Sequence, residues 1–457
     1  MDFFKLKENN TSFKTEVIAG LTTFLAMVYI IPVNSSIVGN TGMPIEALIT
    51  ATALITIVAS AFNAFFANTP VAMSVGMGLN AYFTFAVCLG QKIPWQSALG
   101  AVFISSIIFL LLSFTHFRLW VIRNIPKDLR LAICAGIGCF IAFLGLSQMG
   151  VIMHNKDTLV SIGNFKSPHM LFGIFTLALI IFFWAIKLRG AFIFGVLASS
   201  IIAWIFHLDN ASFPVQIFSL PNFSMENGLG AIFLQLDIKS ALNITMIPII
   251  LTFFITQLFD SIGTITGVGE RGKIFDDPKI GTITGVGERG KIFDDPKNGE
   301  KKLSKTLMAD ATGSALGAMT GTSTVTAFVE STTGVESGGR TGLTALVVAI
   351  CFAFTLFLLP LFKAIPANAI YPVLVMVGIL MFMEVKNIDF KDSAIAVASF
   401  FTIIMMPFTY SITTGFAFGF LSYLLVRIFK REWDKINLGI IVLSLLSLGN
   451  FLLMALQ

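Results

Sequence analysis

Charged residues are scarce in this sequence: Asp, Glu, Lys and Arg make up only 12% of its 457 residues, whereas 56% are hydrophobic. A chain with so little charge and a mean hydropathy of +0.87 is too apolar for a soluble domain of any class. A helix needs about 20 mostly apolar residues to cross a bilayer, and runs of that kind recur along the chain. The composition therefore predicts a polytopic membrane protein.

Metal and redox chemistry also lack their usual residues. The four cysteines lie in apolar runs, and Cys134-x4-Cys139 fits no metal or redox motif. The four histidines include no pair at i,i+4, which argues against a zinc site. No small-residue cleavage site follows the first apolar run, which begins after Lys14, so we expect the first helix to be retained. We expect no metal and no bound cofactor.

Fourteen apolar segments can be placed along the chain. They fall at 16–37, 46–67, 71–90, 95–114, 128–147, 169–186, 190–207, 243–268, 304–320, 324–336, 340–362, 368–385, 392–408 and 411–428. A further apolar run at 436–455 either lies on the membrane surface or spans the membrane as a fifteenth segment.

The Lys and Arg residues lie at the ends of these segments and form no patch interleaved with aromatics, so we expect no nucleic-acid partner. With a cytoplasmic N-terminus, 25 of the 30 Lys and Arg residues lie on the cytoplasmic side. The other five are Lys92, Lys156, Lys166, Lys239 and Lys363. Cytoplasmic loops carry such an excess, which predicts a multi-pass protein of the cell membrane with its N-terminus inside.

Short internal similarities indicate that the two halves are related. Ile125-Pro126 and Ile365-Pro366 each open a segment, and Leu99–Val102 has a looser counterpart in Leu343–Leu346. Seven segments per half would invert the second copy, as in many secondary transporters. The expected divisions are an N-terminus at 1–15, a first repeat at 16–207, an external loop at 208–242, a second repeat at 243–428 and a C-terminal tail at 429–457.

A second repeat is exact. Residues 262–279 recur without a change as residues 280–297, inside the second half. Divergent evolution does not leave such an identity, so it is a recent duplication or an artefact of the sequence record. The second copy is too charged to span a membrane and is expected to loop into the cytoplasm. Its Gly-x-Gly lacks the Walker spacing, which argues against nucleotide binding.

Two polar groups of residues interrupt the apolar spans before residue 300. Around Gly76 and Gly78 a short extended piece could give way to a half-helix that carries Asn80, and such breaks are tolerated where they line a cavity. In the eighth segment Thr256, Asp260 and Thr264 recur at intervals of four and form one helical stripe. An intramembrane carboxylate such as Asp260 is a functional candidate. The alternatives are a packing face of glycines and a protonated Asp bonded to a hydroxyl.

The third polar group is residues 321–334. Its alternating Thr322, Thr324 and Thr326 suit a short strand, and a half-helix is expected to follow from near Ala327, with Glu330 in its first turn. The Phe328 ring could stack on a flat ligand. The structural alternative is that the hydroxyls join helices and Glu330 pairs elsewhere.

Two desolvated carboxylates suit proton coupling and can pair with the N–H groups of a ring. An anion would instead call for Lys or Arg near the half-helices, and none occurs in these stretches. The pattern therefore favours a weakly charged heterocycle as the substrate.

At these residues the chain resembles the AzgA-like purine permeases, a branch of the xanthine/uracil permease superfamily. The similar stretches are 15–24, 76–83, 258–264, 321–334, 338–345 and 404–412, including Gly-Met-Gly-Leu-Asn-Ala-Tyr-Phe and Leu-Phe-Asp-Ser-Ile-Gly-Thr. They extend over nearly the whole chain. The 18-residue duplication departs from the family, which has one copy.

The resemblance implies an all-α protein of fourteen transmembrane segments in two inverted seven-segment repeats, with a core and a gate domain and short strands in broken segments 3 and 10. It implies import of adenine, guanine or hypoxanthine, driven by a proton gradient without a cofactor, and it places substrate and coupling positions at Asn80, Asp260 and Glu330. Phe328, Thr326 and Thr264 complete our candidate site. The expected partners are a purine, a proton and the lipid bilayer, and a homodimer is allowed.

Several alternatives stay open. A uracil or xanthine permease and an anion transporter would have the same architecture, and a channel would show flux without saturation. Sodium is an alternative to the proton as coupling ion. An enzyme would need a nucleophile–base pair or a metal cluster, which the sequence does not offer.

Overall fold

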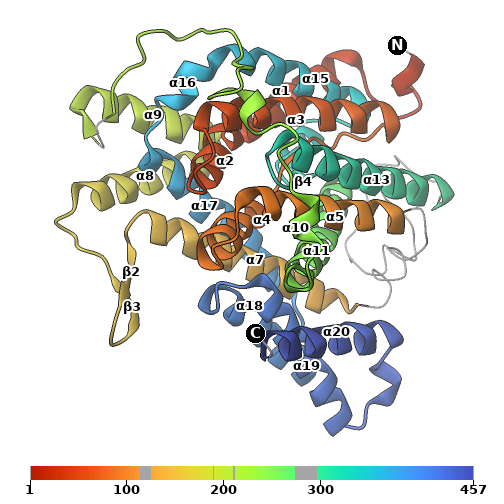
Figure 1. The fold of residues 1–457 in the computed structure, drawn as a ribbon. Coiled ribbons are helices and arrows are strands. Elements are labelled where there is room, and N and C mark those ends of the chain that lie inside the picture. The colour runs from red at the N-terminus through yellow and green to blue at the C-terminus, as the bar shows by residue number, and fades with distance from the viewer. Residues whose placement is uncertain (1, 114–124, 189, 209–210, 273–295, 456–457) are drawn as a thin grey trace.

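The computed structural model describes residues 2–113, 125–188, 190–208, 211–272 and 296–455. These residues are mainly helical (Figure 1). The first half contains α1 (Phe13–Met27), α2 (Ile30–Gly39), α3 (Ile45–Phe66), β1 (Met73–Val75), α4 (Met77–Ala81) with a π-helix at Tyr82–Gly90, α5 (Trp95–Ser113), α7 (Lys127–Gln148), β2 (Ile152–Asn155), β3 (Leu159–Ile162), α8 (Pro168–Ala185) and α9 (Ala191–Phe206).

The second half has a similar order of long helices, again with one strand–helix break. It contains α10 (Ile238–Ala241), α11 (Ile247–Gly272), α13 (Pro296–Thr320), β4 (Val325–Ala327), α14 (Ser331–Glu336), α15 (Gly342–Thr355), α16 (Leu359–Lys363), α17 (Ala367–Phe382), α18 (Ser393–Phe408), α19 (Ile412–Phe429) and α20 (Leu438–Ala455).

The membrane prediction is confirmed. Eight helical stretches among the described residues are long and apolar enough to span a membrane, and shorter apolar helices accompany them. Every expected segment coincides with a helix or with one of two strand–helix breaks. Two boundaries differ, because α11 continues to Gly272 and α13 begins at Pro296. Most of the second copy of the duplication lies outside the described residues, so its expected cytoplasmic loop stays a prediction.

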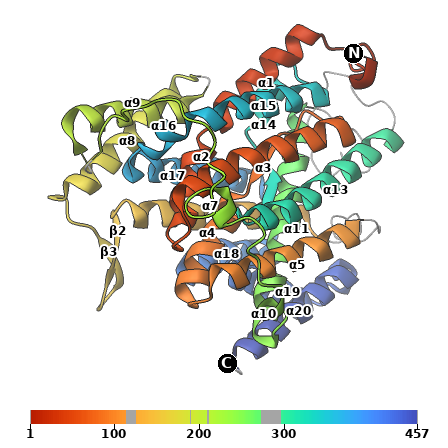
Figure 2. The ribbon, with the colours of Figure 1, turned by 45° about the horizontal axis from the view of Figure 1, so that its top comes forward.

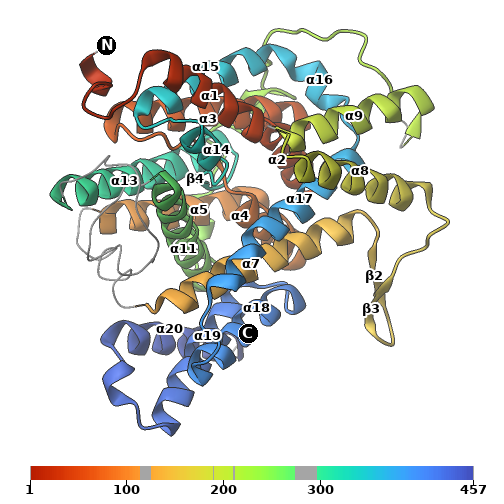
Figure 3. The same cartoon turned by 180° about the vertical axis from the view of Figure 1, so that it is seen from behind.

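The helices pack as two bundles. The gate bundle contains α7, α8, α9, α17, α18 and α19, in which α17 packs on α7, α8 and α9 (Figure 3). The core bundle contains α1 to α5, α11 and α13 to α16, together with β1 and β4. Its two strands pair in the interior, where Met73 and Val325 are fully buried.

The packing obeys a repeat of seven segments. The contact of α5 with α13 recurs between α15 and α3, and the contact of α7 with α18 recurs between α17 and α8. Pro126 and Pro366, from the two Ile-Pro pairs, occupy the N-cap positions of α7 and α17. β1 and β4 pair antiparallel with Ser74 opposite Thr326, as two halves related by a two-fold axis would. The inverted-repeat prediction is confirmed.

One hairpin was not predicted. β2 and β3 pair antiparallel and project from the gate bundle between α7 and α8 (Figure 1). The side chain of Asn155 closes the turn by accepting the N–H groups of Asp157 at 2.8 Å and Thr158 at 3.1 Å. Asn is a common turn former for this reason, so the turn had a sequence signal.

The C-terminal helix α20 packs on α19 (Figure 2). The Ser444 hydroxyl donates to the Phe420 carbonyl at 3.2 Å, and the rings of Phe418 and Phe451 meet edge to face at 5.4 Å. The apolar tail is therefore attached to the gate bundle.

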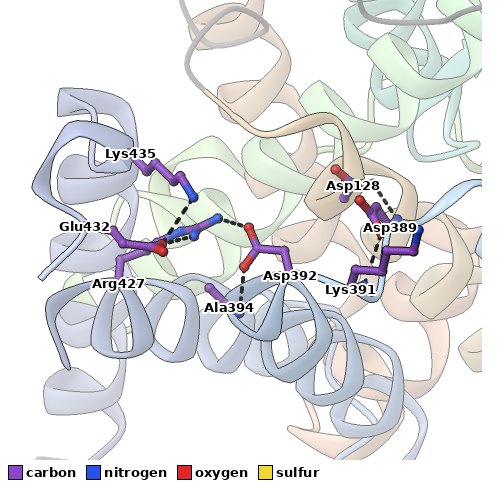
Figure 4. A network of polar contacts seen from close by, with 8 residues as sticks. All are labelled: Asp128, Asp389, Lys391, Asp392, Ala394, Arg427, Glu432 and Lys435. Carbon is purple, nitrogen blue, oxygen red and sulfur yellow. Dashed lines mark hydrogen bonds and ion pairs between the residues drawn. The ribbon is translucent and has the colours of Figure 1, made fainter. Parts of the chain in front are cut away.

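A polar network lies at one end of the gate bundle (Figure 4). Arg427, which is 3% exposed, pairs with both Asp392 and Glu432, and Lys435 lies 3.4 Å from Glu432. The hydrogen bond from Arg427, aided by the charge of Lys435, holds the pKa of Glu432 below its ordinary value of 4.5. This network joins α18 and α19 to the segment that leads into α20.

Candidate functional site

The two broken segments meet in the core bundle. β1 and β4 pair over three residues each, and the pairing extends on both sides. The Phe328 N–H donates to the Ala72 carbonyl, and the Gly76 N–H to the Thr324 carbonyl, each at 3.0 Å. Each strand then leads into a short helix, α4 or α14. Irregular backbone is thereby satisfied inside the protein, as membrane depth requires.

One serine holds each strand in the same way. Ser60 of α3 accepts the N–H of Met73 and donates to its carbonyl, each at 2.9 Å. Ser314 of α13 accepts the N–H of Val325 at 3.0 Å and donates to the Val325 carbonyl. We call Ser60 and Ser314 the clamp serines. Each clamp serine bonds the backbone N–H and carbonyl that a further neighbouring strand would otherwise bond.

Glu330 lies at the N-cap position of α14 and is 6% exposed. Its side chain makes no capping hydrogen bond. The Tyr29 hydroxyl, from the turn between α1 and α2, donates to Glu330 Oε1. The prediction for this stretch was wrong in its boundaries: the strand is Val325–Ala327, and α14 begins at Ser331. The pairing of Phe328 with Ala72 extends the strand conformation past Ala327.

Asp260 lies near both Glu330 and β4. It is partly exposed, and its helix α11 packs against both β4, which carries Thr326, and α14, whose N-cap residue is Glu330. Thr256, one turn earlier on α11, also has a buried hydroxyl without a hydrogen-bond partner in the described structure. Thr264, one turn later, is partly buried.

Asn80 is fully buried on α4. Its Nδ2 donates to Asn34 Oδ1 of α2, and Asn34 Nδ2 donates to Thr52 Oγ1 at 2.8 Å. The Asn80 Oδ1 atom has no hydrogen-bond partner among the described residues, although it is buried. The side chain of Phe328 is 3% exposed, and its stacking on a ligand stays a prediction.

Four residues around the breaks were missed by the sequence analysis: Tyr29, Asn34, Gln257 and Asp310. Asp310 of α13 is fully buried, and it accepts the Ala327 N–H at 2.8 Å and the Ser261 hydroxyl at 2.5 Å. It lies inside the apolar segment 304–320, so the criterion that selected Asp260 would have found it. The other three carry no comparable signal.

Gln257 of α11 has a defined orientation. The only proton of the Ser314 hydroxyl goes to the Val325 carbonyl, so Ser314 Oγ must accept a hydrogen bond from Gln257 Nε2. The Gln257 Oε1 atom is then left buried without a partner among the described residues. Gln257 Oε1 is therefore a hydrogen-bond acceptor whose position is set by the bond from Nε2 to Ser314.

A further buried carboxylate, Glu16 of α1, is structural. It accepts the N–H groups of Arg340 at 2.8 Å and Thr344 at 3.2 Å, and the Thr344 hydroxyl at 2.5 Å. These bonds hold α1 to the start of α15. Both of its oxygens are occupied, in contrast to the less enclosed Asp260.

The site therefore presents two carboxylates near each other, unpaired hydroxyls and amide oxygens, all at a break between inverted repeats. Such groups can accept ring N–H donors, and a protonated carboxyl can donate in return. Within the ranges that the structure describes, no group of three or more His, Cys, Asp or Glu could hold a metal ion. The fold, with its two strand–helix breaks paired between the repeats, defines the class of secondary transporters.

Comparison with known proteins supports the assignment to a transporter. The model of the Permease family (Xan_ur_permease) matches residues 14–418, and the chain belongs to this family. It is accordingly a transporter and not an enzyme. It is 38% identical to the adenine permease AdeQ of Escherichia coli over 97% of this chain and 94% of that protein. It is 37% identical to the guanine/hypoxanthine permease PbuO of Bacillus subtilis, over 97% and 98% of the two chains.

Two solved structures share the fold. The transmembrane domain of the cyanobacterial bicarbonate transporter BicA has a TM-score of 0.63 at 14% identity, covering 86% of this chain and 95% of that chain. The murine anion transporter Slc26a9 has a TM-score of 0.59 at 12% identity, covering 91% and 68%. At such identity the likeness concerns the fold alone.

Proposed function

We propose that the protein imports purine nucleobases across the cell membrane by proton symport and alternating access, with its N-terminus in the cytoplasm. The names of relatives at 37–38% identity over nearly the whole chain support a purine as cargo. The observation that carries the site is the pairing of the two breaks, with Glu330 before α14 and Asp260 on α11, the helix that packs against both β4 and α14.

The chemistry of the site fits a heterocycle. Asn80 Oδ1 and Gln257 Oε1 are buried acceptors that lack donors in the described structure, and purines carry ring or amino N–H donors. Leaving such atoms unpaired costs about 1–3 kcal/mol each, which a matching ligand recovers. Glu330 or Asp260 can then carry the proton that is transported with the purine.

The test is uptake of labelled adenine, guanine and hypoxanthine in cells that lack their own permeases. We expect saturable uptake that stops when the proton gradient is collapsed and persists without sodium. Glu330→Gln and Asp260→Asn should each abolish accumulation. Glu46→Gln, which removes a carboxylate paired with Lys363 away from the breaks, is the matched control and should transport normally.

Four results would overturn the proposal. If the wild-type protein takes up no purine, purines are not the cargo. If uptake is competed by uracil, xanthine or bicarbonate and by no purine, that competitor is the cargo instead. Normal accumulation by both carboxylate variants would refute the site. Flux without saturation and without response to the gradient would indicate a channel.

A further inference from the structure

Tyr29 lies where the regular hydrogen bonding of the first transmembrane span, Phe13–Gly39, is interrupted, although its backbone remains helical. α1 ends at Met27 and α2 begins at Ile30, and Tyr29 lies in the turn between them, fully buried. Pro32 explains the break, because a proline ring clashes with the carbonyl four residues earlier, here that of Val28. The side chain of Tyr29 therefore projects from a turn in which the Ile31 N–H bonds to the Val28 carbonyl, three residues earlier, and not to the carbonyl four residues earlier.

The hydroxyl and the ring of Tyr29 contact different bundles. The hydroxyl donates to Glu330 Oε1 in the core bundle. The ring meets the ring of Phe192 edge to face, with centroids 5.4 Å apart and an interplanar angle of 76°. Phe192 is the second residue of α9, which belongs to the gate bundle.

The start of α9 packs closely against α1. Gly190, which precedes α9, has a φ of +77°, and a Cβ added to it would lie 3.2 Å from Leu25 Cβ and 3.3 Å from the Leu25 carbonyl oxygen. Leu25 lies one turn before Tyr29 on the same segment. A shift of α9 relative to α1 must therefore change the contact between Phe192 and Tyr29.

We propose that Tyr29 is a positioning residue that couples Glu330 to the gate bundle. Its hydroxyl orients the Glu330 carboxylate, and its ring contact with Phe192 makes the position of α9 depend on the state of that carboxylate. The inference rests on the proposed function for its transport readout. A substrate that binds the Glu330 carboxylate meets it in the orientation that the Tyr29 hydroxyl sets, and it shares the carboxylate with that hydroxyl. A ligand shifts a conformational equilibrium only through contacts that differ between the states, and this contact supplies such a difference.

The chain offers matched variants. Tyr29→Phe removes only the hydroxyl, and Phe192→Leu removes only the ring contact. Phe352→Leu is the control, because Phe352 packs edge to face on Phe24 at 5.3 Å, with the same geometry but inside the core bundle. Phe192→Tyr keeps the ring and should behave as wild type.

We expect Tyr29→Phe to raise the KM for purine uptake about tenfold or more, as loss of a hydrogen bond to a charged group does. Phe192→Leu should lower the maximal rate about two- to tenfold, in line with the strength of aromatic pairs, and leave KM within about twofold. The proposal is wrong if Phe192→Leu and Phe352→Leu have the same effect on the maximal rate, or if Tyr29→Phe leaves KM unchanged.

A measurement without substrate separates this inference from the proposed function. Spin labels at Phe206→Cys in α9 and Ile45→Cys in α3, which are 69% and 48% exposed, report the distance between gate and core in protein whose four native cysteines are replaced. Tyr29→Phe and Phe192→Leu should each change the ratio of the distance populations about two- to tenfold, and Phe352→Leu should not. Unchanged ratios would overturn the coupling even if wild type transports purines. Wild type without purine uptake would refute only the proposed function.

Discussion

The two broken segments share a backbone and differ in charge. Each runs from a three-residue strand into a short helix, and each strand is held at its N–H and carbonyl by one clamp serine. One turn before the clamp serine, α3 carries Thr56, whose hydroxyl meets Ser74 Oγ at 2.6 Å, whereas α13 carries Asp310, which binds the Ala327 N–H.

The same contrast holds for the short helices. Asn80 of α4 bonds to a neutral amide, Asn34, whereas Glu330 before α14 accepts a hydrogen bond from Tyr29. Asp260, Asp310 and Glu330 all come from the second repeat. The two repeats therefore share the backbone geometry of the break, whereas these carboxylates come from one repeat only.

The largest expected effect concerns Asp310 and Thr56. Asp310→Ala leaves the buried Ala327 N–H and the Ser261 hydroxyl without their acceptor, and we expect a loss of about 3 kcal/mol in the free energy of unfolding. Thr56→Val removes one hydroxyl pair and should cost about 1 kcal/mol. Thermal unfolding of the purified protein in detergent measures both. Equal losses would show that the two positions are equivalent despite the charge.

The next effect concerns Gly334 of α14 and Gly76 before α4. A Cβ at Gly334 would lie 2.1 Å from Thr23 Oγ1 and 2.7 Å from the Ala19 carbonyl oxygen, whereas one at Gly76 would lie 3.1 Å from Thr326 Cγ2. Gly334→Ala should therefore cost about 2 kcal/mol and Gly76→Ala less than about 1 kcal/mol. The combination of Gly334→Ala with Thr23→Ala should recover part of the loss. No recovery would assign the cost to the α1 backbone.

A smaller effect separates the clamp serines. Both bind an N–H and a carbonyl of a strand, but Ser314 also accepts the hydrogen bond from Gln257. Ser314→Ala should cost about 1 kcal/mol more than Ser60→Ala. In a Gln257→Leu background this difference should disappear. The free energies of unfolding of the single and double variants, compared in a double-mutant cycle, measure it. A difference that persists would mean that the Gln257 bond contributes nothing.

The smallest expected effect lies in the gate bundle, away from the breaks. Because its folded pKa is below the ordinary value of 4.5, Glu432 stabilises the folded state fully above that pH, and its contribution is lost as the pH falls through the folded pKa. Glu432→Gln should therefore lower the melting temperature slightly at pH 7 and not at acidic pH. A shift that is independent of pH would exclude the ion pair with Arg427 as its cause.

Much of this organisation could be predicted from sequence. The apolar runs gave the segments, since each must cross a bilayer, and the glycines with isolated polar residues marked both breaks and pointed to Asn80, Asp260 and Glu330. Asp310 was accessible by the same reasoning.

Other features depend on contacts that local sequence does not contain. Tyr29 and Asn34 look like ordinary members of an apolar run, and only the fold brings them to Glu330 and Asn80. The start of α14 at Ser331 followed from the pairing of Phe328 with Ala72, which joins residues of different repeats.

The pairing of β1 with β4 also has a consequence for synthesis. Val75 and its partner Val325 are separated by about 250 residues, so at about 5–20 residues per second roughly 10 to 50 s pass between their translation. During that interval the first strand has emerged with polar backbone groups that lack their final partners, in an environment where this is costly. Ser60 bonds to Met73 from within the same half, so only the strand edge that faces away from β4 can be satisfied before the second half is made. The edge that faces β4 gains its hydrogen bonds only when the second repeat has been made, since Ala72 and Gly76 pair with Phe328 and Thr324.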